Sequence, residues 1–146
     1  MEKGEDKQYD YVLDLDVTSP LRNIHDLQEA FAVIKKDKQA LNLFSVSHPN
    51  RNPYFNVIEV NESGYAQIVK PMKSPFYSRQ SAPKVYDVNG SFYIYRRDFF
   101  KQKLTSALTT RTIPFLVEHL CFDIDNFHDF LVMDFLIRED KLDFVL

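Results

Sequence analysis

The chain has 146 residues, of which 45% are hydrophobic and 27% charged, and its formal net charge is −3. This length suits one domain, and the acidic balance excludes a nucleic-acid binder that relies on bulk positive charge. The single cysteine, Cys121, cannot form an internal disulfide, so a reducing, cytoplasmic setting is expected. No apolar run is long enough to span a bilayer, and three scattered glycines cannot build a Gly-rich phosphate loop.

The first third of the chain predicts alternating strands and a helix. Residues 11–15 are largely apolar and predict a buried strand, which ends in the polar turn 16–22. Asn23 suits a helix N-cap, and an apolar stripe continues from there to about Lys36. Residues 40–46 predict the next strand. This strand–helix–strand order favours an α/β fold with a largely parallel sheet.

Residues 47–85 have a different character and predict an excursion from the α/β core. A turn cluster is followed by short β-like runs at 54–60 and 65–69, and the Glu62-Ser63-Gly64 turn between them predicts a hairpin. Prolines then interrupt regular structure.

The core resumes with a strand at 91–95, a short helix near 98–104 and a strand near 113–117. The aromatic stripe at 92–100 is typical of a core. A last helix is expected to start at Asp125 or Asn126, with its apolar face formed by Phe127, Phe130, Leu131 and Phe135.

Two carboxylates, Asp123 and Asp125, are spaced so that an extended backbone points both to one side. Mg²⁺ prefers oxygen ligands and is often held by one or two carboxylates together with substrate phosphates. The alternative from spacing alone is that Asp125 caps the helix and Asp123 is solvated.

A second candidate is the stretch 14–22, where an apolar strand changes abruptly into hydroxyl, proline and arginine residues. Thr18 and Ser19 can donate hydrogen bonds, and Arg22 can grip a carboxylate or phosphate through two contacts. The alternative is an ordinary turn with Arg22 on the surface. A third stretch, 70–86, carries four basic and no acidic side chains before Tyr86, which suits an anionic ligand or a solvated loop. The four histidines lack metal-ligand spacing, and Cys121 is interpreted as a buried, inert thiol.

Three blocks together resemble the acylneuraminate (CMP-nonulosonate) cytidylyltransferases. Residues 15–22, LDVTSPLR, are similar to the family's strand-end motif, and 88–94, VNGSFYI, look like its Asn-Gly-Ala/Ser-x-Tyr strand. Residues 122–126, FDIDN, look like its metal-binding Asp-x-Asp before the final helix. The blocks occur in the family's order, and the resemblance covers nearly all of residues 9–138.

The resemblance implies an α/β, Rossmann-like nucleotidyltransferase that uses CTP to activate a nonulosonic sugar acid and releases pyrophosphate. It also implies a homodimer in which the excursion 47–85 exchanges contacts, with no nucleic-acid or membrane partner. Mg²⁺ would bind Asp123 and Asp125, which with Arg22 are the expected catalytic residues. The implied sugar-site residues are Asp16, Ser19, Arg22, Gln80, Asn89 and Tyr93.

Two departures from the family pattern shape this expectation. Family members begin with an Arg-Gly-Gly-Ser-Lys-type loop that cradles the triphosphate, and nothing before Tyr9 matches it. We therefore expect residues 1–146 to be an N-terminally truncated cytidylyltransferase domain, impaired on its own. Asp16 and Asp87 stand where sialic-acid-activating members tend to carry Gln and Arg, which favours a related nonulosonic acid over N-acetylneuraminate. A glycosyltransferase with a D-x-D metal site and a non-catalytic oligomerisation remnant are the alternatives.

Overall fold

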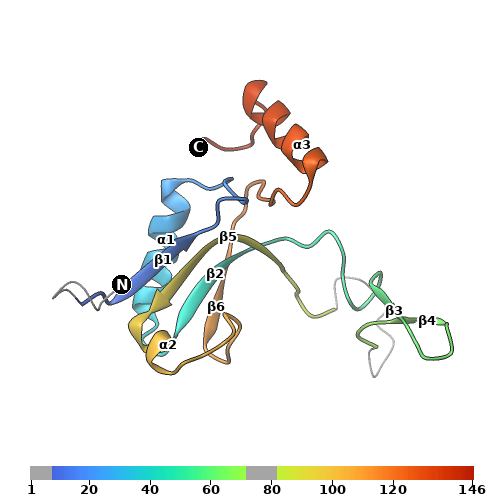
Figure 1. Cartoon of the computed structure of the whole chain (residues 1–146), viewed down its shortest axis with the longest axis horizontal. Coiled ribbons are helices and arrows are strands. Elements are labelled where there is room, and N and C mark those ends of the chain that lie inside the picture. Colours follow the sequence, from blue (N-terminus) through green and yellow to red (C-terminus); the bar gives the residue numbers. More distant parts are fainter. Residues whose placement is uncertain (1–7, 72–81) are drawn as a thin grey trace. The chain divides into compact units, whose positions relative to one another are not determined.

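The structure, a computed structural model, describes residues 8–71 and 82–146. The chain divides into two compact units (Figure 1). One unit comprises the residues up to Ser47 together with Val88–Leu146, and the other comprises His48–Asp87, where the excursion was expected. Lys73, Arg79 and Gln80 lie outside the described residues.

The first unit is built on a four-stranded mixed sheet with the strand order β1-β5-β2-β6. The strands are β1 (Tyr11–Leu15), β2 (Asn42–Ser47), β5 (Asp87–Arg96) and β6 (Thr112–Leu116). β1 pairs antiparallel with β5, whereas β2 and β6 are parallel. The sheet is therefore mixed rather than largely parallel, because β5 lies between the two strands that flank the first helix. Hydrophobic periodicity predicts a strand but carries no information about its direction.

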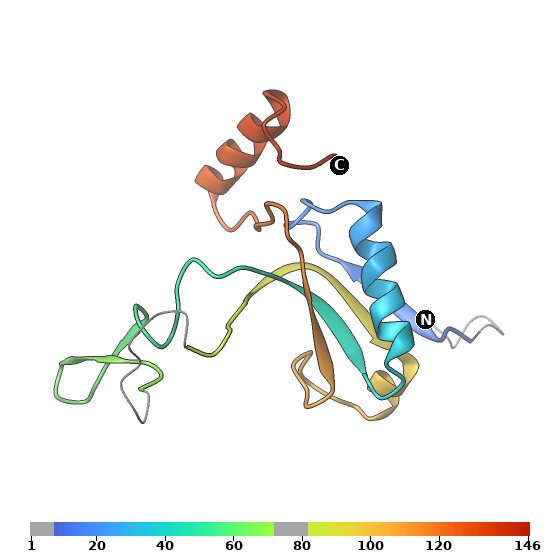
Figure 2. The same cartoon turned by 180° about the vertical axis from the view of Figure 1, so that it is seen from behind.

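One face of this sheet is covered by α1 (Ile24–Lys36), as Figures 1 and 2 show from opposite sides. The predicted cap is confirmed: the Asn23 side chain accepts from the Asp26 N–H at 3.0 Å, and the Asn23 N–H donates to Asp26 Oδ2 at 2.9 Å. Such a capping box satisfies backbone donors that the first turn leaves unpaired. The buried core beneath the helix contains Ala30, Ile34, Ala40, Leu43, Phe92, Ile94 and Val117.

Strand β1 is exposed, although its apolar run predicted burial. Val12, Leu13 and Leu15 keep 37%, 49% and 39% of their surface accessible. The reason is position: in the described part of the chain, β1 is an end strand of the sheet. The apolar run therefore predicted the strand correctly, but its prediction of burial was wrong.

The last helix, α3 (Phe127–Arg138), starts where the sequence placed it, with Asn126 as its N-cap. Its predicted apolar face is not buried: Phe127, Phe130, Leu131 and Phe135 are all exposed, and the buried residue is Met133. Nearly every position of this helix other than its two aspartates is apolar or aromatic, so periodicity alone could not select the packed face. A shorter helix, α2 (Arg97–Lys101), follows β5 directly.

The second unit contains the predicted hairpin. Strands β3 (Ile58–Val60) and β4 (Ala66–Ile68) pair antiparallel. Gly64 occupies the turn at φ 83°, a left-handed conformation that glycine adopts without steric cost. Across both units, no described helix is long and apolar enough to cross a membrane.

Candidate functional site

The turn that follows β1 is ordered by its own side chains. Asp16 Oδ1 accepts hydrogen bonds from the backbone N–H and the hydroxyl of Thr18, both at 2.8 Å. The Asp16 N–H donates to the Ser91 carbonyl of β5 at 3.2 Å. Two donors on one carboxylate oxygen favour its ionised form and lower the pKa of Asp16, with a smaller contribution from the positive charge of Arg22. Asp16 is therefore a fixed, exposed negative charge.

Arg22 braces this turn from inside. Its Nη1 donates to three backbone carbonyls, those of Asp16 at 2.9 Å, Ser19 at 2.6 Å and Ser91 at 3.0 Å. The side chain is half-buried and connects the turn to β5. The sequence left two options for Arg22, a surface position in an ordinary turn or a guanidinium that grips a ligand. The structure instead shows this guanidinium bound to backbone carbonyls of the protein.

Ser19 and Asn89 belong to a buried polar network beneath the turn. Ser19 is 0% and Asn89 6% exposed. The Ser19 hydroxyl donates to the Asn89 carbonyl at 2.9 Å. The Asn89 amide oxygen accepts from the Ser45 hydroxyl at 2.5 Å and the Ser91 N–H at 3.2 Å, and its amide nitrogen donates to Ser47 Oγ at 2.8 Å. Both residues thus hold the site together from within, and neither presents its side chain openly to a ligand.

Gly90 brings β5 close to the Asp16 carboxylate. It adopts φ 68°, and a Cβ built there would lie 4.0 Å from Asp16 Oδ2. That spacing is an ordinary contact, so the need for glycine comes from the left-handed backbone and not from lack of space.

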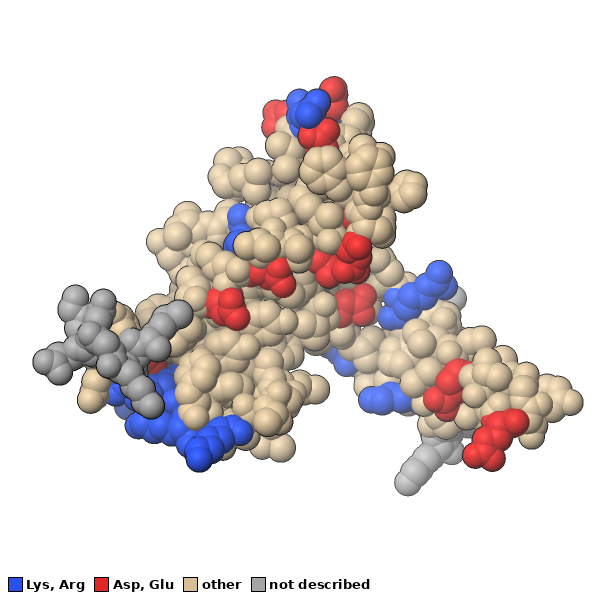
Figure 3. Space-filling view, in the orientation of Figure 1, with Lys and Arg blue, Asp and Glu red and all other residues tan. Residues whose placement is uncertain are grey.

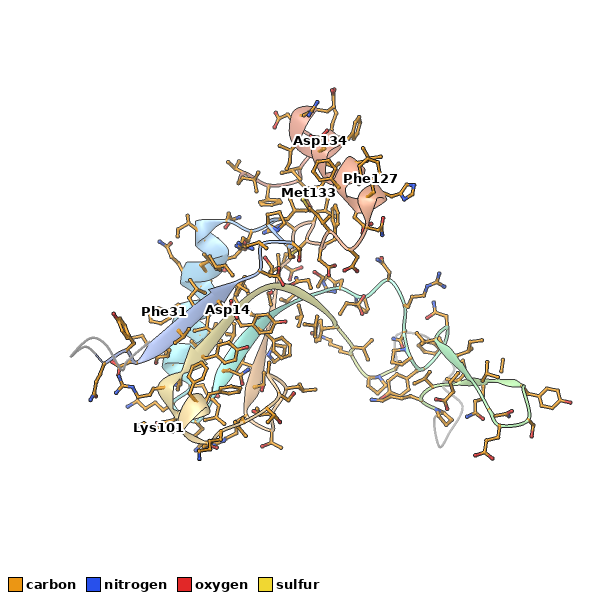
Figure 4. All side chains as sticks on the ribbon, viewed as in Figure 1. Asp14, Phe31, Lys101, Phe127, Met133 and Asp134 are labelled. Atoms are coloured by element: carbon orange, nitrogen blue, oxygen red, sulfur yellow. The ribbon has the colours of Figure 1, made fainter. Side chains whose placement is uncertain are left out.

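Three carboxylates surround Tyr93 on the accessible side of the sheet. Burial raises the pKa of the Tyr93 hydroxyl, and the negative charges of Asp16, Asp14 and Asp123 raise it further. Asp14, labelled in Figure 4, is the direct cross-strand partner of Tyr93 and so shares its face of the sheet. Acidic side chains gather on the face shown in Figure 3, below α3. The site therefore carries strong negative charge.

The Asp123–Asp125 segment is joined to the same turn, because the Ile124 N–H donates to the Thr18 carbonyl at 2.8 Å. Asn126, not Asp125, caps α3, and Asp129 Oδ2 accepts from the N–H groups of both Asp125 and Asn126 at 3.0 Å. Asp123 and Asp125 are both exposed. Two accessible carboxylates on one anchored segment fit the oxygen chemistry of Mg²⁺. Within the described ranges, no three His, Cys, Asp or Glu side chains form a complete metal-holding group.

The structure thus brings five of the expected residues to one place: Asp16, Ser19, Arg22, Asn89 and Tyr93 cluster around the turn, with the Asp123 segment attached. Gln80 lies outside the described residues. Sequence reasoning included Asp14 in the candidate stretch 14–22 and Ser91 in the 88–94 motif but gave neither residue a role. It missed Ser45 and Ser47, because isolated serines in a strand carry no signal of a site.

Cys121 behaves as the sequence indicated. The thiol is half-buried against the core, and burial raises its pKa, outweighing hydrogen bonds from Ser19 and Ser91 that act in the opposite direction. Because the thiolate is the nucleophilic form, a raised pKa disfavours a nucleophilic role for this cysteine.

Comparison with known proteins gives two informative matches. The chain is 40% identical, over 136 residues, to a post-translational flagellin modification protein B of Campylobacter coli, covering 92% of this chain and 56% of that protein. It is 41% identical, over 93 residues, to a CMP-N,N'-diacetyllegionaminic acid synthase of Campylobacter jejuni, covering 63% of this chain and 38% of that one. The chain thus spans about half the length, or less, of these relatives. No family model matches it.

Proposed function

This chain is a relative of the CMP-nonulosonate cytidylyltransferases, and we propose that it forms the sugar-facing and metal-facing side of such an enzyme. The observation that carries the proposal is the convergence of all three motifs on one surface. The Asp16 turn, the Asn89–Ser91 start of β5 and the Asp123 segment are joined by direct hydrogen bonds. Motifs that are distant in sequence and converge in space indicate a shared site.

The proposed reaction joins CTP to a nonulosonic acid. The anomeric hydroxyl oxygen of the sugar acid attacks the α-phosphorus of CTP, forming a new P–O bond. The bond from that phosphorus to the bridging oxygen of the β-phosphate breaks, pyrophosphate leaves, and the hydroxyl proton passes to solvent or a base. Positioning and charge neutralisation are the main demands of such a transfer.

Asp123 and Asp125 are the residues that would hold Mg²⁺. When bound, the ion would neutralise charge on the phosphates of CTP. The hydrogen bond from Ile124 to Thr18 supports this assignment, because it ties the two carboxylates to the turn that carries Asp16.

Asp16 and Tyr93 would contact the sugar. An ionised carboxylate accepts hydrogen bonds, so Asp16 suits hydroxyl or acylamino N–H groups and repels a carboxylate. With Asp14 and Asp123 close to Tyr93, the sugar's own carboxylate is expected to lie away from this cluster. The legionaminic acid derivative named for one relative carries two acetamido groups and therefore offers such N–H donors.

The experiment measures pyrophosphate release and, separately, binding by calorimetry with CTP, MgCl₂ and a panel of nonulosonic acids. We expect Mg²⁺-dependent CTP binding that Asp123→Asn and Asp125→Asn both weaken, and binding of N,N'-diacetyllegionaminic acid that Asp16→Ala weakens. Asp134→Asn is the matched acidic control, because Asp134 lies on α3 and pairs with Arg138 at 2.8 Å. If the wild-type chain binds neither CTP nor any of the nonulosonic acids, the proposal is refuted and a non-catalytic oligomerisation role is favoured.

We also propose that the 47–85 segment forms a homodimer contact. The exposed apolar side chains of Ile58 and Val60 on β3 support this assignment. Ile58→Lys with Val60→Lys should reduce the mass measured by light scattering to that of a monomer, whereas Leu108→Lys, at an exposed site of the first unit, should not. A monomeric wild-type chain would contradict it.

We propose a cytoplasmic setting as well. The chain has a single cysteine, which cannot form an internal disulfide, and this favours a reducing compartment.

A further inference from the structure

Arg22 makes its hydrogen bonds in an unusual way for an anion-binding arginine. A guanidinium that grips a carboxylate or phosphate normally presents two parallel N–H groups from different nitrogens. Here a single nitrogen, Nη1, meets the carbonyls of Asp16, Ser19 and Ser91, with the Ser91 hydroxyl a fourth, longer contact at 3.4 Å. All four acceptors belong to the protein.

These acceptors mark the two ends of the turn and the strand beneath it. The Asp16 and Ser19 carbonyls lie on either side of the bend at residues 17 and 18, and Ser91 lies on β5. Two further bonds close the same junction: the Ser91 hydroxyl donates to the Ser19 carbonyl at 3.0 Å, and the Asp16 N–H donates to the Ser91 carbonyl. Three carbonyls pointing at one place would repel one another without a cation between them.

We propose that Arg22 is a positioning residue, which fixes the Asp16 carboxylate at the sugar site by holding these three carbonyls and does not itself bind the sugar acid. The inference rests on the proposed function for the identity of the ligand. Its structural part is independent: without Arg22 the turn loosens from β5, and the Asp16 side chain loses its fixed place beside Gly90 and Tyr93.

Lysine distinguishes the two roles. Its ammonium group is a point charge with three N–H donors, so it can serve the three carbonyls that the two N–H groups of Nη1 share. It cannot reproduce the planar, two-nitrogen grip on a carboxylate. A positioning role therefore predicts rescue by Arg22→Lys, and a gripping role predicts failure. Arg22→Met keeps the aliphatic stem and removes every donor.

The experiment compares wild type, Arg22→Lys and Arg22→Met by two measurements. Amide hydrogen exchange follows the N–H groups of Asp16 and Ile124, whose acceptors lie on β5 and in the turn. Calorimetry measures the affinity for N,N'-diacetyllegionaminic acid. The matched control is Arg96→Met, because Arg96 also holds backbone carbonyls, those of Ile34 and Asp37, at the far end of β5.

We expect Arg22→Met to increase exchange at both amides and to weaken sugar binding at least about tenfold. Arg22→Lys should preserve amide protection and keep affinity within about threefold, and Arg96→Met should leave these two amides unchanged. The inference is overturned if Arg22→Met retains both protected amides, or if Arg22→Lys loses sugar affinity while its amides stay protected. If Arg22→Met fails to fold, Arg22→Lys alone decides by the same criteria. A wild-type chain that binds no sugar would refute the proposed function, while the exchange data would still decide whether Arg22 holds the turn.

Discussion

Replacing Asn89 with alanine tests the buried network directly. Its side chain makes three hydrogen bonds, to the Ser45 hydroxyl, the Ser91 N–H and the Ser47 hydroxyl. Only the first has a substitute close by, because Ser45 Oγ also lies 3.3 Å from the Phe92 carbonyl. Ser47 can still donate to the Cys121 carbonyl at 3.4 Å. The Ser91 N–H, in a residue that is 0% exposed, loses the Asn89 oxygen as its acceptor.

The expected cost follows from this count. Leaving one buried backbone donor unpaired costs about 1–3 kcal/mol, and the one side-chain bond lost without a substitute, that to Ser47, contributes about 0.5–1.5 kcal/mol net. We therefore expect Asn89→Ala to lower the free energy of unfolding by about 3 kcal/mol, a large share of the stability of an ordinary domain.

The assay is urea unfolding followed by amide exchange of the β2 and β5 core, because the chain has two compact units and a single bulk signal would mix them. A decrease in the free energy of unfolding below about 1 kcal/mol would show that water or rearranged side chains replace the lost hydrogen bonds, and it would refute the reasoning. If Asn89→Ala instead kept full stability and lost only sugar affinity, Asn89 would be a ligand contact as the family motif implied.

Three further predictions concern the turn, the glycines and the last helix. Gly90→Ala and Gly64→Ala should each lower the free energy of unfolding in urea by about 1–2 kcal/mol, because both positions have a left-handed backbone and an added Cβ would meet no close neighbour at either. A much larger effect at Gly90 alone would reveal crowding there. Since the folded pKa of Asp16 is lowered, its ionisation adds stability above the unfolded pKa, and this is lost as the pH falls through the folded value. The stability advantage of wild type over Asp16→Asn should accordingly be constant near neutral pH and shrink below about pH 4, and a flat difference down to pH 2 would contradict the Thr18 hydrogen bonds. Asn126→Ala should cost about 1 kcal/mol and increase exchange in the first turn of α3, whereas unchanged exchange would argue against the capping box.

Local signals identified the elements of this protein. Asn23 and Asn126 are short polar side chains placed before apolar runs, and each caps the helix that follows it. The hairpin around Gly64 followed from turn residues between two β-like runs. These features depend on neighbours within a few residues, so the chain's order alone contains the information needed to predict them.

Only the tertiary structure decided how these elements are used. The direction and the neighbours of each strand depend on long-range pairing. Here that pairing placed β5 beside β1 and left the apolar strand β1 exposed. The same holds at the candidate site. The sequence placed Asp16, Arg22 and Asn89 in family motifs and predicted that they face the ligand. The fold brought the three together but gave them different environments: Asp16 is accessible, Asn89 is buried and Arg22 is bound to carbonyls. Hydrogen bonds between residues about 70 positions apart determine which of these side chains are accessible.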